Sequence, residues 1–269
     1  MADDKDPFDF NGSFGDFRSY DDPATGKHII SRKGGPSAKQ FNNDPNYARH
    51  RERSNEFGGR SLWASLLKKS LSDIGHLMHV RCFNPMMSGG YRIQQKEPDG
   101  IAGFKSIAVI NNPGSLAMIE FNKLHPFRSV ISVSHTCNLS PDKTTVTLSI
   151  PELIISRDIR WPFKFYAVRI HMVIAQISDV CWNPVLKVYQ PVVPDLEVLS
   201  QCVISDWMVQ NSVPNEVNLE ASFEEPAFSI PGTTVIVAMG VEISLNAFSG
   251  QPYVTPRNGT AAIVGYFAE

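Results

Sequence analysis

The stretch FKFYAVRIHMVIAQI, residues 163–177, decides the fold class of this chain of 269 residues. Its side chains alternate between two sets that occupy opposite faces of an extended backbone. One set is Phe165, Ala167, Arg169, His171, Val173 and Ala175, and the other is Tyr166, Val168, Ile170, Met172, Ile174 and Gln176. Large apolar residues dominate, which is typical of a long strand inside a sheet. We therefore predict a β-strand over residues 163–177.

Similar runs, rich in Val, Ile and Thr and separated by Gly, Pro or Asn, surround that strand. They lie at 105–110, 117–121, 129–134, 144–150, 185–189, 198–208, 216–222, 233–245 and 261–267. No helical period separates them, so a parallel sheet with crossover helices is not expected. An Asn-Gly pair within residues 257–260 predicts a hairpin turn before the last run. The prediction is a mainly β domain over residues 101–269, an antiparallel β-sandwich of the Greek-key or jelly-roll type.

A helical segment is predicted over residues 44–80. Asp44 followed by Pro45 is a helix-start signal, because Asp is a good N-cap and Pro fits the first helical position. The two glycines at 58–59 should interrupt the helix. Beyond them, apolar residues recur at helical spacing and form a stripe along one face. We expect a helical hairpin or a kinked long helix.

Residues 1–43 are predicted to form an extended polar arm. Five Gly and three Pro residues break any periodicity there. Short apolar islands survive, and we expect their aromatic side chains to anchor the arm on another protein surface. The alternative is a solvated tail in which these side chains have no function. The candidate anchors are Phe8, Phe10, Phe14, Phe17 and Tyr20.

Charge is distributed unevenly along the chain. Residues 1–22 hold seven acidic and two basic residues, a net charge of −5, whereas residues 23–70 hold ten basic and three acidic residues, a net charge of +7. The overall charge of −2 excludes a uniformly basic nucleic-acid binder but leaves room for a local basic patch. Within the basic segment 27–69, the alternatives are salt-sensitive contact with nucleic acid and a solvated surface. The candidate contacts to phosphate or to a protein partner are Arg32, Lys33, Arg49, Arg51, Arg53 and Arg60.

The chain lacks the marks of export and of membrane insertion. It has no run of about 18 apolar residues, so no membrane span is predicted. Its acidic N-terminus has no apolar core of a signal peptide, so we expect a cytoplasmic or particle-associated protein. The four cysteines include no Cys-x-x-Cys pair and are expected to be reduced, buried thiols. They are Cys82, Cys137, Cys181 and Cys202.

Motifs that carry chemistry are weak. His76-x-x-His79-x-x-Cys82 has metal-like spacing, but two histidines at a helix end explain it equally simply, and the sequence leaves open whether His76 and His79 bind a metal. The pair His135 and Cys137 shares a strand face without an orienting third group. We therefore assign no catalytic, cofactor or metal residue and do not expect an enzyme, although a site grafted on a sandwich needs no local motif.

One resemblance is present in residues 28–75. Ile29-Ile30-Ser31-Arg32-Lys33-Gly34-Gly35-Pro36 is followed by Asn43-Asp44-Pro45-Asn46, Arg49-His50-Arg51-Glu52 and Asn55-Glu56-Phe57-Gly58-Gly59. This order resembles a group of uncharacterised Bacteroidota proteins with a KGG, NDP, RxRE, EFG signature ahead of a variable β-rich body. The resemblance implies a recurring N-terminal module on a β domain and a bacterial, cytoplasmic origin. It brings no known activity and no catalytic residues.

Two classes of function follow from these observations. The first is a non-enzymatic structural or assembly protein, a particle-forming homo-oligomer in which an N-terminal arm ties the β-sandwich to its neighbours. The second is a binding module that recognises carbohydrate, peptide or nucleic acid through the sandwich loops and the basic arm. Exposure of Trp161, Trp182 or Trp207 in a groove would favour the second class, and burial of all three would count against it.

Overall fold

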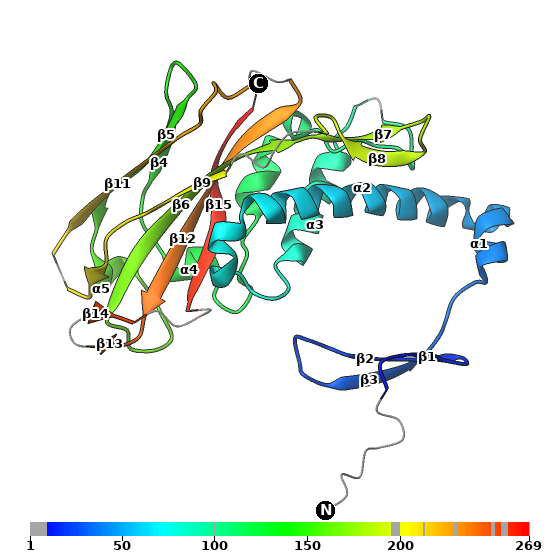
Figure 1. Ribbon diagram of the computed structural model, residues 1–269, viewed down its shortest axis with the longest axis horizontal. Coiled ribbons are helices and arrows are strands. Elements are labelled where there is room, and N and C mark those ends of the chain that lie inside the picture. The colour runs from blue at the N-terminus through cyan, green and yellow to red at the C-terminus, as the bar shows by residue number, and fades with distance from the viewer. Residues whose placement is uncertain are drawn as a thin grey trace, which may run out of the picture. The chain divides into compact units, whose positions relative to one another are not determined.

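The computed structural model describes residues 10–98, 100–194, 200–211, 213–228, 231–248, 251–253 and 258–268 (Figure 1). The chain divides into two compact units, Met1–Arg51 and Glu52–Glu269. The fold is mainly β, with antiparallel sheets and a helix that follows the N-terminal strands, which confirms the predicted fold class. Among the described helices, none is long and apolar enough to cross a membrane.

The first unit contains a three-stranded antiparallel sheet with the order β1-β2-β3. Its strands are β1 (Gly12–Phe14), β2 (Phe17–Asp21) and β3 (His28–Arg32). Gly15 and Gly26 both adopt positive φ in the turns that join these strands. Glycines of this kind stop a helix but favour tight hairpins. Residues 12–32 are therefore a folded sheet rather than the extended arm that was predicted.

Two short helices follow in the first unit, α1 (Ala38–Asn43) and the 3-10 helix η1 (Pro45–Tyr47). The Asp44 side chain accepts a hydrogen bond from the Asn46 backbone N–H, and Pro45 occupies the first turn. This arrangement confirms the predicted helix start at Asp44 and Pro45. The long helix α2 (Ala48–Ser70) begins directly afterwards.

The predicted break at residues 58–59 is wrong, because α2 runs through both glycines without interruption. Gly59 is buried, and a Cβ atom placed there would lie 2.7 Å from the ring of Tyr189. A Cβ atom at Gly58 would meet nothing within 4 Å. Gly59 therefore permits a close approach of Tyr189 to the helix, and the packing outweighs the roughly 1 kcal/mol that a glycine costs a helix interior.

Helical structure extends beyond the predicted limit at residue 80. The 3-10 helix η2 (Ser72–Leu77) follows α2, and the helix α3 (Phe83–Gln94), which was not predicted, comes next. Gly90 of α3 is buried, and a Cβ atom there would lie 3.1 Å from the Trp63 ring. Small residues thus let α3 pack closely against α2, but they also weaken the apolar stripe by which a helix is recognised in a sequence.

Two antiparallel sheets form the β body. The larger one has the order β10-β6-β12-β15, with β9 also paired to β6, and the smaller one has the order β11-β5-β4. The strands are β4 (Thr136–Leu139), β5 (Thr145–Leu153), β6 (Ala167–Ser178), β9 (Ser200–Ile204), β10 (Met208–Val209), β11 (Asn215–Ser222), β12 (Thr233–Ser244) and β15 (Gly259–Ala268). Separate hairpins are β7 (Val180–Asn183) with β8 (Val188–Pro191), and β13 (Ala247–Phe248) with β14 (Gln251–Pro252).

The larger sheet lies between two hydrophobic cores. Alternate residues of β6 and β12, such as Ile170 and Val237, pack with β5 and β11 of the smaller sheet. The intervening residues, such as Val173 and Ile236, pack with α2, η2 and α3. Every residue of β12 is buried for this reason. The two facing sheets are consistent with the predicted sandwich, and helices cover the outer face of the larger sheet (Figure 1).

The predicted strand at 185–189 lies mostly in the turn between β7 and β8, and only its last two residues belong to β8. Three other predicted strands are wrong. The runs at 105–110, 117–121 and 129–134 each make only one isolated bridge, through Ile107, Glu120 and Ile131. Short helical turns replace the strands, because Pro113 and Pro126 begin such turns and Pro lacks the N–H that a ladder needs. These turns are η3 (Val109–Asn111), η4 (Pro113–Met118), α4 (Phe127–Val130) and, after β5, α5 (Ile155–Asp158).

Two further boundaries also changed. The first ladder strand of the body is β4 at Thr136 rather than near residue 101. Of the predicted turn at 257–260, Arg257 lies outside the described residues, and Gly259 and Thr260 already belong to β15.

The two neighbouring glycines of α2 provide a matched test of this packing. We expect Gly58→Ala to raise the free energy of unfolding by about 0.5–1 kcal/mol through helix propensity. Gly59→Ala should lower it by about 1–3 kcal/mol, because the Tyr189 ring is fixed by a 3.0 Å hydrogen bond from its hydroxyl to the Lys105 carbonyl and cannot move away freely. Urea unfolding of both variants measures the difference, and equal effects would contradict the assigned role of Gly59.

Candidate functional site

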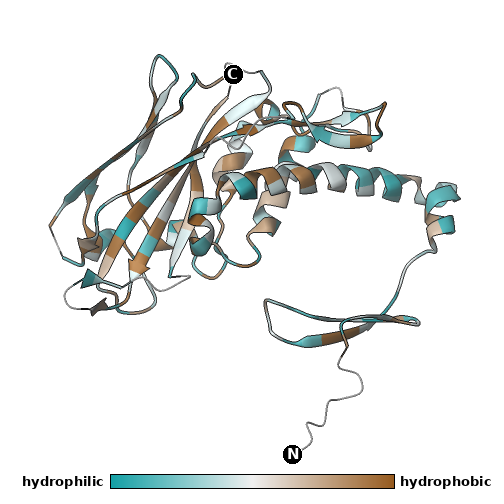
Figure 2. Ribbon diagram, in the orientation of Figure 1, coloured by the Kyte–Doolittle hydropathy of each residue, from teal (hydrophilic) through white to brown (hydrophobic). Residues whose placement is uncertain are grey.

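Three ionisable side chains gather on the helix-covered face of the larger sheet. Arg169 and His171 lie on β6 and alternate in phase with Val173, which packs against the helices. Glu242 lies on β12 directly opposite Arg169 in the strand register, and Gly240 lies opposite His171. The three side chains therefore share one face, and Figure 2 shows hydrophilic residues among the hydrophobic ones on β6.

A fourth ionisable side chain, His76, reaches this group from the 3-10 helix η2. A Cβ atom at Gly240 would lie 2.6 Å from Leu77 Cδ1, and one at Gly259 would lie 2.7 Å from Leu77 Cδ2. The two glycines, on adjacent strands, therefore form the depression that receives the Leu77 side chain. That close approach places His76, the residue before Leu77, beside Glu242.

The Glu242 carboxylate is at the centre of the cluster. Its Oε2 accepts hydrogen bonds from Arg169 Nε at 2.6 Å and His171 Nε2 at 2.8 Å. His76 Nε2 lies 3.5 Å from the other oxygen, Oε1. The Arg169 guanidinium also lies 4.5 Å from the centre of the Trp207 ring, a cation–π contact that holds the guanidinium in place.

Burial and hydrogen bonding act in opposite directions on this carboxylate. Glu242 and His171 are each 1% exposed, whereas the His76 side chain is 37% exposed. Burial by itself raises the pKa of Glu242, but the contacts with His171, His76 and Arg169 outweigh it and hold that pKa well below its usual range. Glu242 is therefore ionised at neutral pH.

Two atoms of the cluster are buried without a hydrogen bond, Glu242 Oε1 and His171 Nδ1. A separation of 3.5 Å is too long for His76 Nε2 to satisfy Oε1. Among the described residues, His76, His171 and Glu242 form the group whose ligand atoms lie close enough, within 4.8 Å of one another, to hold a metal ion. Their two imidazoles and one carboxylate are ligands that divalent transition metals accept.

The structure separates the residues of the metal-like sequence motif. His76 points to the strands, whereas His79 Nδ1 accepts a hydrogen bond from the Arg81 backbone N–H. Cys82 is buried, and burial raises the pKa of its thiol. His171 and Glu242 were not singled out from the sequence. A signal was present, since an ionisable residue inside an otherwise apolar strand is rarely buried without a partner.

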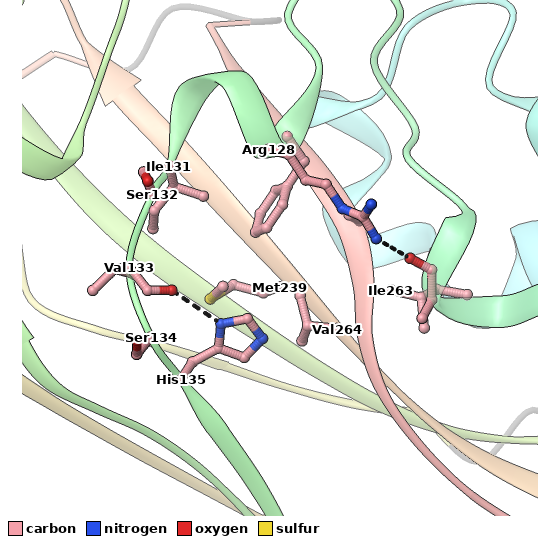
Figure 3. Close-up of a pocket in the computed structure, with 12 residues that line it drawn as sticks. Arg128, Ile131, Ser132, Val133, Ser134, His135, Met239, Ile263 and Val264 are labelled. Atoms are coloured by element: carbon pink, nitrogen blue, oxygen red, sulfur yellow. Dashed lines mark hydrogen bonds between the residues drawn. The ribbon is translucent and has the colours of Figure 1, made fainter. Parts of the chain in front are cut away.

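A hollow of about 460 Å³ lies between residues 127–135 and the strands β12 and β15 (Figure 3). Arg128 Nη2 donates to the Ala117 carbonyl at 2.8 Å, and Arg128 Nε lies 3.5 Å from Glu120 Oε1. His135 Nδ1 lies 3.4 Å from the Val133 carbonyl. Burial raises the pKa of the neighbouring Cys137 thiol to about 11, so it is protonated and a weak nucleophile at neutral pH.

The predicted basic contacts fall into both units and differ in their surroundings. Arg32 pairs with Asp16 at 3.6 Å, and Lys33 Nζ donates to the Gly15 carbonyl. Arg51 donates to the Phe41 and Asp44 carbonyls, and Arg60 donates to Gln94 Oε1 and lies over the Tyr91 ring. Arg49 and Arg53 are exposed. The intramolecular contacts give Arg51 and Arg60 a local structural role.

The predicted aromatic anchors also lie in different settings. Phe8 is outside the described residues, and Phe10 is half-buried. Phe14, Phe17 and Tyr20 are exposed on the sheet of the first unit, with exposed fractions of 77%, 49% and 43%.

The exposure of three tryptophans was expected to distinguish a binding module from a structural protein. Trp161, Trp182 and Trp207 are all half-buried. Trp161 packs against His125 and Trp182 against Phe104 and Tyr189, while Trp207 lies under Arg169. Their surroundings therefore decide for neither class.

Comparisons with known proteins add no assignment. No protein-family model, no curated protein and no solved structure matches the chain. The resemblance to Bacteroidota proteins stays a prediction.

The pKa of Asp179, between β6 and β7, is shifted in the opposite direction to that of Glu242. Asp179 Oδ1 accepts one hydrogen bond, from the Val109 backbone N–H at 3.0 Å, and no cation contributes to its pKa. Burial therefore dominates and raises the pKa of Asp179 from 3.8 to about 6. A carboxyl with a raised pKa binds its proton more tightly in the folded state, so the folded state loses stability as pH rises through this interval.

We expect Asp179→Asn to remove that pH dependence while its amide oxygen keeps the bond to Val109. The free energy of unfolding of the variant minus that of the natural protein should rise between pH 4 and pH 7, by roughly 2–3 kcal/mol in total. Denaturant unfolding at several pH values measures this difference, and the titration of other groups cancels in it. A difference that stays constant over this range would contradict the raised pKa.

Proposed function

We propose that this chain is a non-enzymatic structural protein that joins to a second copy of itself through the sheet β1-β2-β3. The observation that carries the proposal is an exposed apolar group on one face of that sheet. Phe14 and Phe17 are opposite one another in the register, and Ile30 lies opposite Ser19. Because directly paired residues share a face, Phe14, Phe17 and Ile30 project from the same side.

Little apolar surface is buried within this sheet. Phe14, Phe17 and Ile30 are 77%, 49% and 45% exposed, and Ser19 is the buried residue of its three strands. A small sheet needs a buried hydrophobic face for stability of its own. Covering these three side chains would contribute about 1.5–3 kcal/mol for each one fully buried. A docking surface on a partner would supply that cover.

A second copy fits this surface for two reasons. The sheet ends in β1 on one side and β3 on the other, and an edge strand can add a strand from another chain. The chain also carries opposite charges in sequence, −5 in residues 1–22 and +7 in residues 23–70. Two copies placed head to tail bring the acidic segment of one to the basic segment of the other, which favours association.

The body does not need the first unit for its own hydrophobic core. Both core clusters consist of residues from Trp63 onward. Removing residues 1–43 therefore leaves those cores intact. The oligomeric state can be tested without unfolding the body.

We expect the full chain to be an oligomer and the triple variant Phe14→Ser, Phe17→Ser, Ile30→Ser to be a monomer. Deletion of residues 1–43 should also give a monomer with a cooperative thermal transition. Size-exclusion chromatography with light scattering measures the particle mass, and circular dichroism follows melting.

The matched control changes the opposite face of the same sheet. Tyr20 and Ile29 are paired there, and Tyr20 lies under the Arg18 guanidinium. Tyr20→Ser with Ile29→Ser should leave the oligomer unchanged. A monomeric full chain, or a triple variant that keeps the full particle mass, would contradict the proposal.

A further inference from the structure

We propose that His76, His171 and Glu242 bind one divalent transition-metal ion, with Zn²⁺ the favoured occupant. This site is independent of the sheet β1-β2-β3 and goes beyond the proposed structural role. The ligand atoms lie within 4.8 Å of one another, and the carboxylate lies between the two imidazoles.

The separation of His76 from Glu242 matches that of two ligands on one small ion. Two ligands about 2.0–2.1 Å from Zn²⁺ at a tetrahedral angle are roughly 3.4 Å apart. His76 Nε2 lies 3.5 Å from Glu242 Oε1, close to that value. The 2.8 Å between His171 Nε2 and Oε2 is a hydrogen bond, so His171 must give up this bond and carry its ring proton on Nδ1 in order to bind the ion through Nε2. His76 is the most exposed of the three, so rotation of its side chain can adjust the remaining distance.

Glu242 Oε1 is the atom that most calls for a ligand. It is buried and accepts no hydrogen bond. A buried acceptor without a partner destabilises a folded protein, and such atoms are uncommon. A cation bound at Oε1 and His76 Nε2 would satisfy it.

Arg169 holds Glu242, the proposed carboxylate ligand, in place by a hydrogen bond. Its Nε donates to Oε2 at 2.6 Å, on the carboxylate oxygen away from His76. Metal-binding carboxylates are usually held by such a hydrogen bond. Trp207 in turn positions the Arg169 guanidinium. Glu242 is thus oriented before any ion arrives.

The site has an access route and room for a further ligand. His76 also lines a hollow of about 480 Å³ together with Lys68, Ser72 and Gly75. Three protein ligands leave one tetrahedral position open, which water can occupy. Imidazole nitrogen ligands favour Zn²⁺ and its neighbours over Mg²⁺ and Ca²⁺, which prefer oxygen.

The test uses the full chain, prepared without a polyhistidine tag and treated with a chelator. Isothermal titration with ZnCl₂ should give one ion per chain, and the melting temperature should rise with added Zn²⁺ because the ion binds the folded state. His76→Ala should weaken Zn²⁺ binding at least tenfold and reduce the rise in melting temperature. MgCl₂ should produce neither effect.

The matched control is His79→Ala, three residues away in the same segment and outside the cluster. It should bind Zn²⁺ as the natural protein does. Because Glu242 and His171 are buried and their variants can fail to fold, the half-exposed His76 carries the test, with far-UV circular dichroism as the check of folding. Absence of Zn²⁺ binding by the natural protein would overturn the proposal. So would equal affinity of His76→Ala, or equal loss in His79→Ala, which would place the ion at the sequence motif instead.

Discussion

The pairing of β6 with β12 is the interaction on which the rest of the body depends. It runs without a register shift from Thr233 opposite Ser178 to Ser244 opposite Ala167. Both strands are covered on both faces, because the smaller sheet packs on one side and the helices on the other. Successive residues along each of these two strands therefore face the two cores in alternation. A shift by one residue would exchange the two cores and place Arg169, His171 and Glu242 between the sheets, so the register is strongly determined.

The same constraint gives the polar cluster its character. A strand buried on both faces excludes water, and a charged side chain on it is costly unless it is paired and hydrogen-bonded. Arg169 offsets the Glu242 charge, and His171 supplies a second donor. The lowered pKa of Glu242 and the raised pKa of Asp179 show both outcomes in one fold, since the first has several donors and the second has one. The proposed metal ion would bind Glu242 Oε1, the carboxylate oxygen that accepts no hydrogen bond from Arg169 or His171.

The sheet of the first unit, unlike the two sheets of the body, buries few of its side chains. Its strands pair through backbone hydrogen bonds and tight glycine turns, but most of their side chains remain exposed. In the proposed assembly, a second copy would supply the buried hydrophobic face that a small sheet needs for stability. Phe14 and Phe17 lie with Ile30 on one face of a folded sheet rather than along an extended chain, whereas Tyr20 lies on the opposite face. Assembly and a metal site are compatible proposals because they use different residues.

The sequence by itself determined the elements whose signals are local. Alternation marks the strands β11 and β12 at 216–222 and 233–245, and it marks β6 within 163–177, although that strand begins only at Ala167. Asp44 with Pro45 marks a helix start because capping involves adjacent residues. Tertiary structure alone decided the role of each glycine. The helix passes through Gly59 because Tyr189 packs there, and η2 docks because Gly240 and Gly259 leave space for Leu77. It likewise brought His76 to His171 and Glu242, since a site built from three elements depends on packing distances that no local pattern encodes.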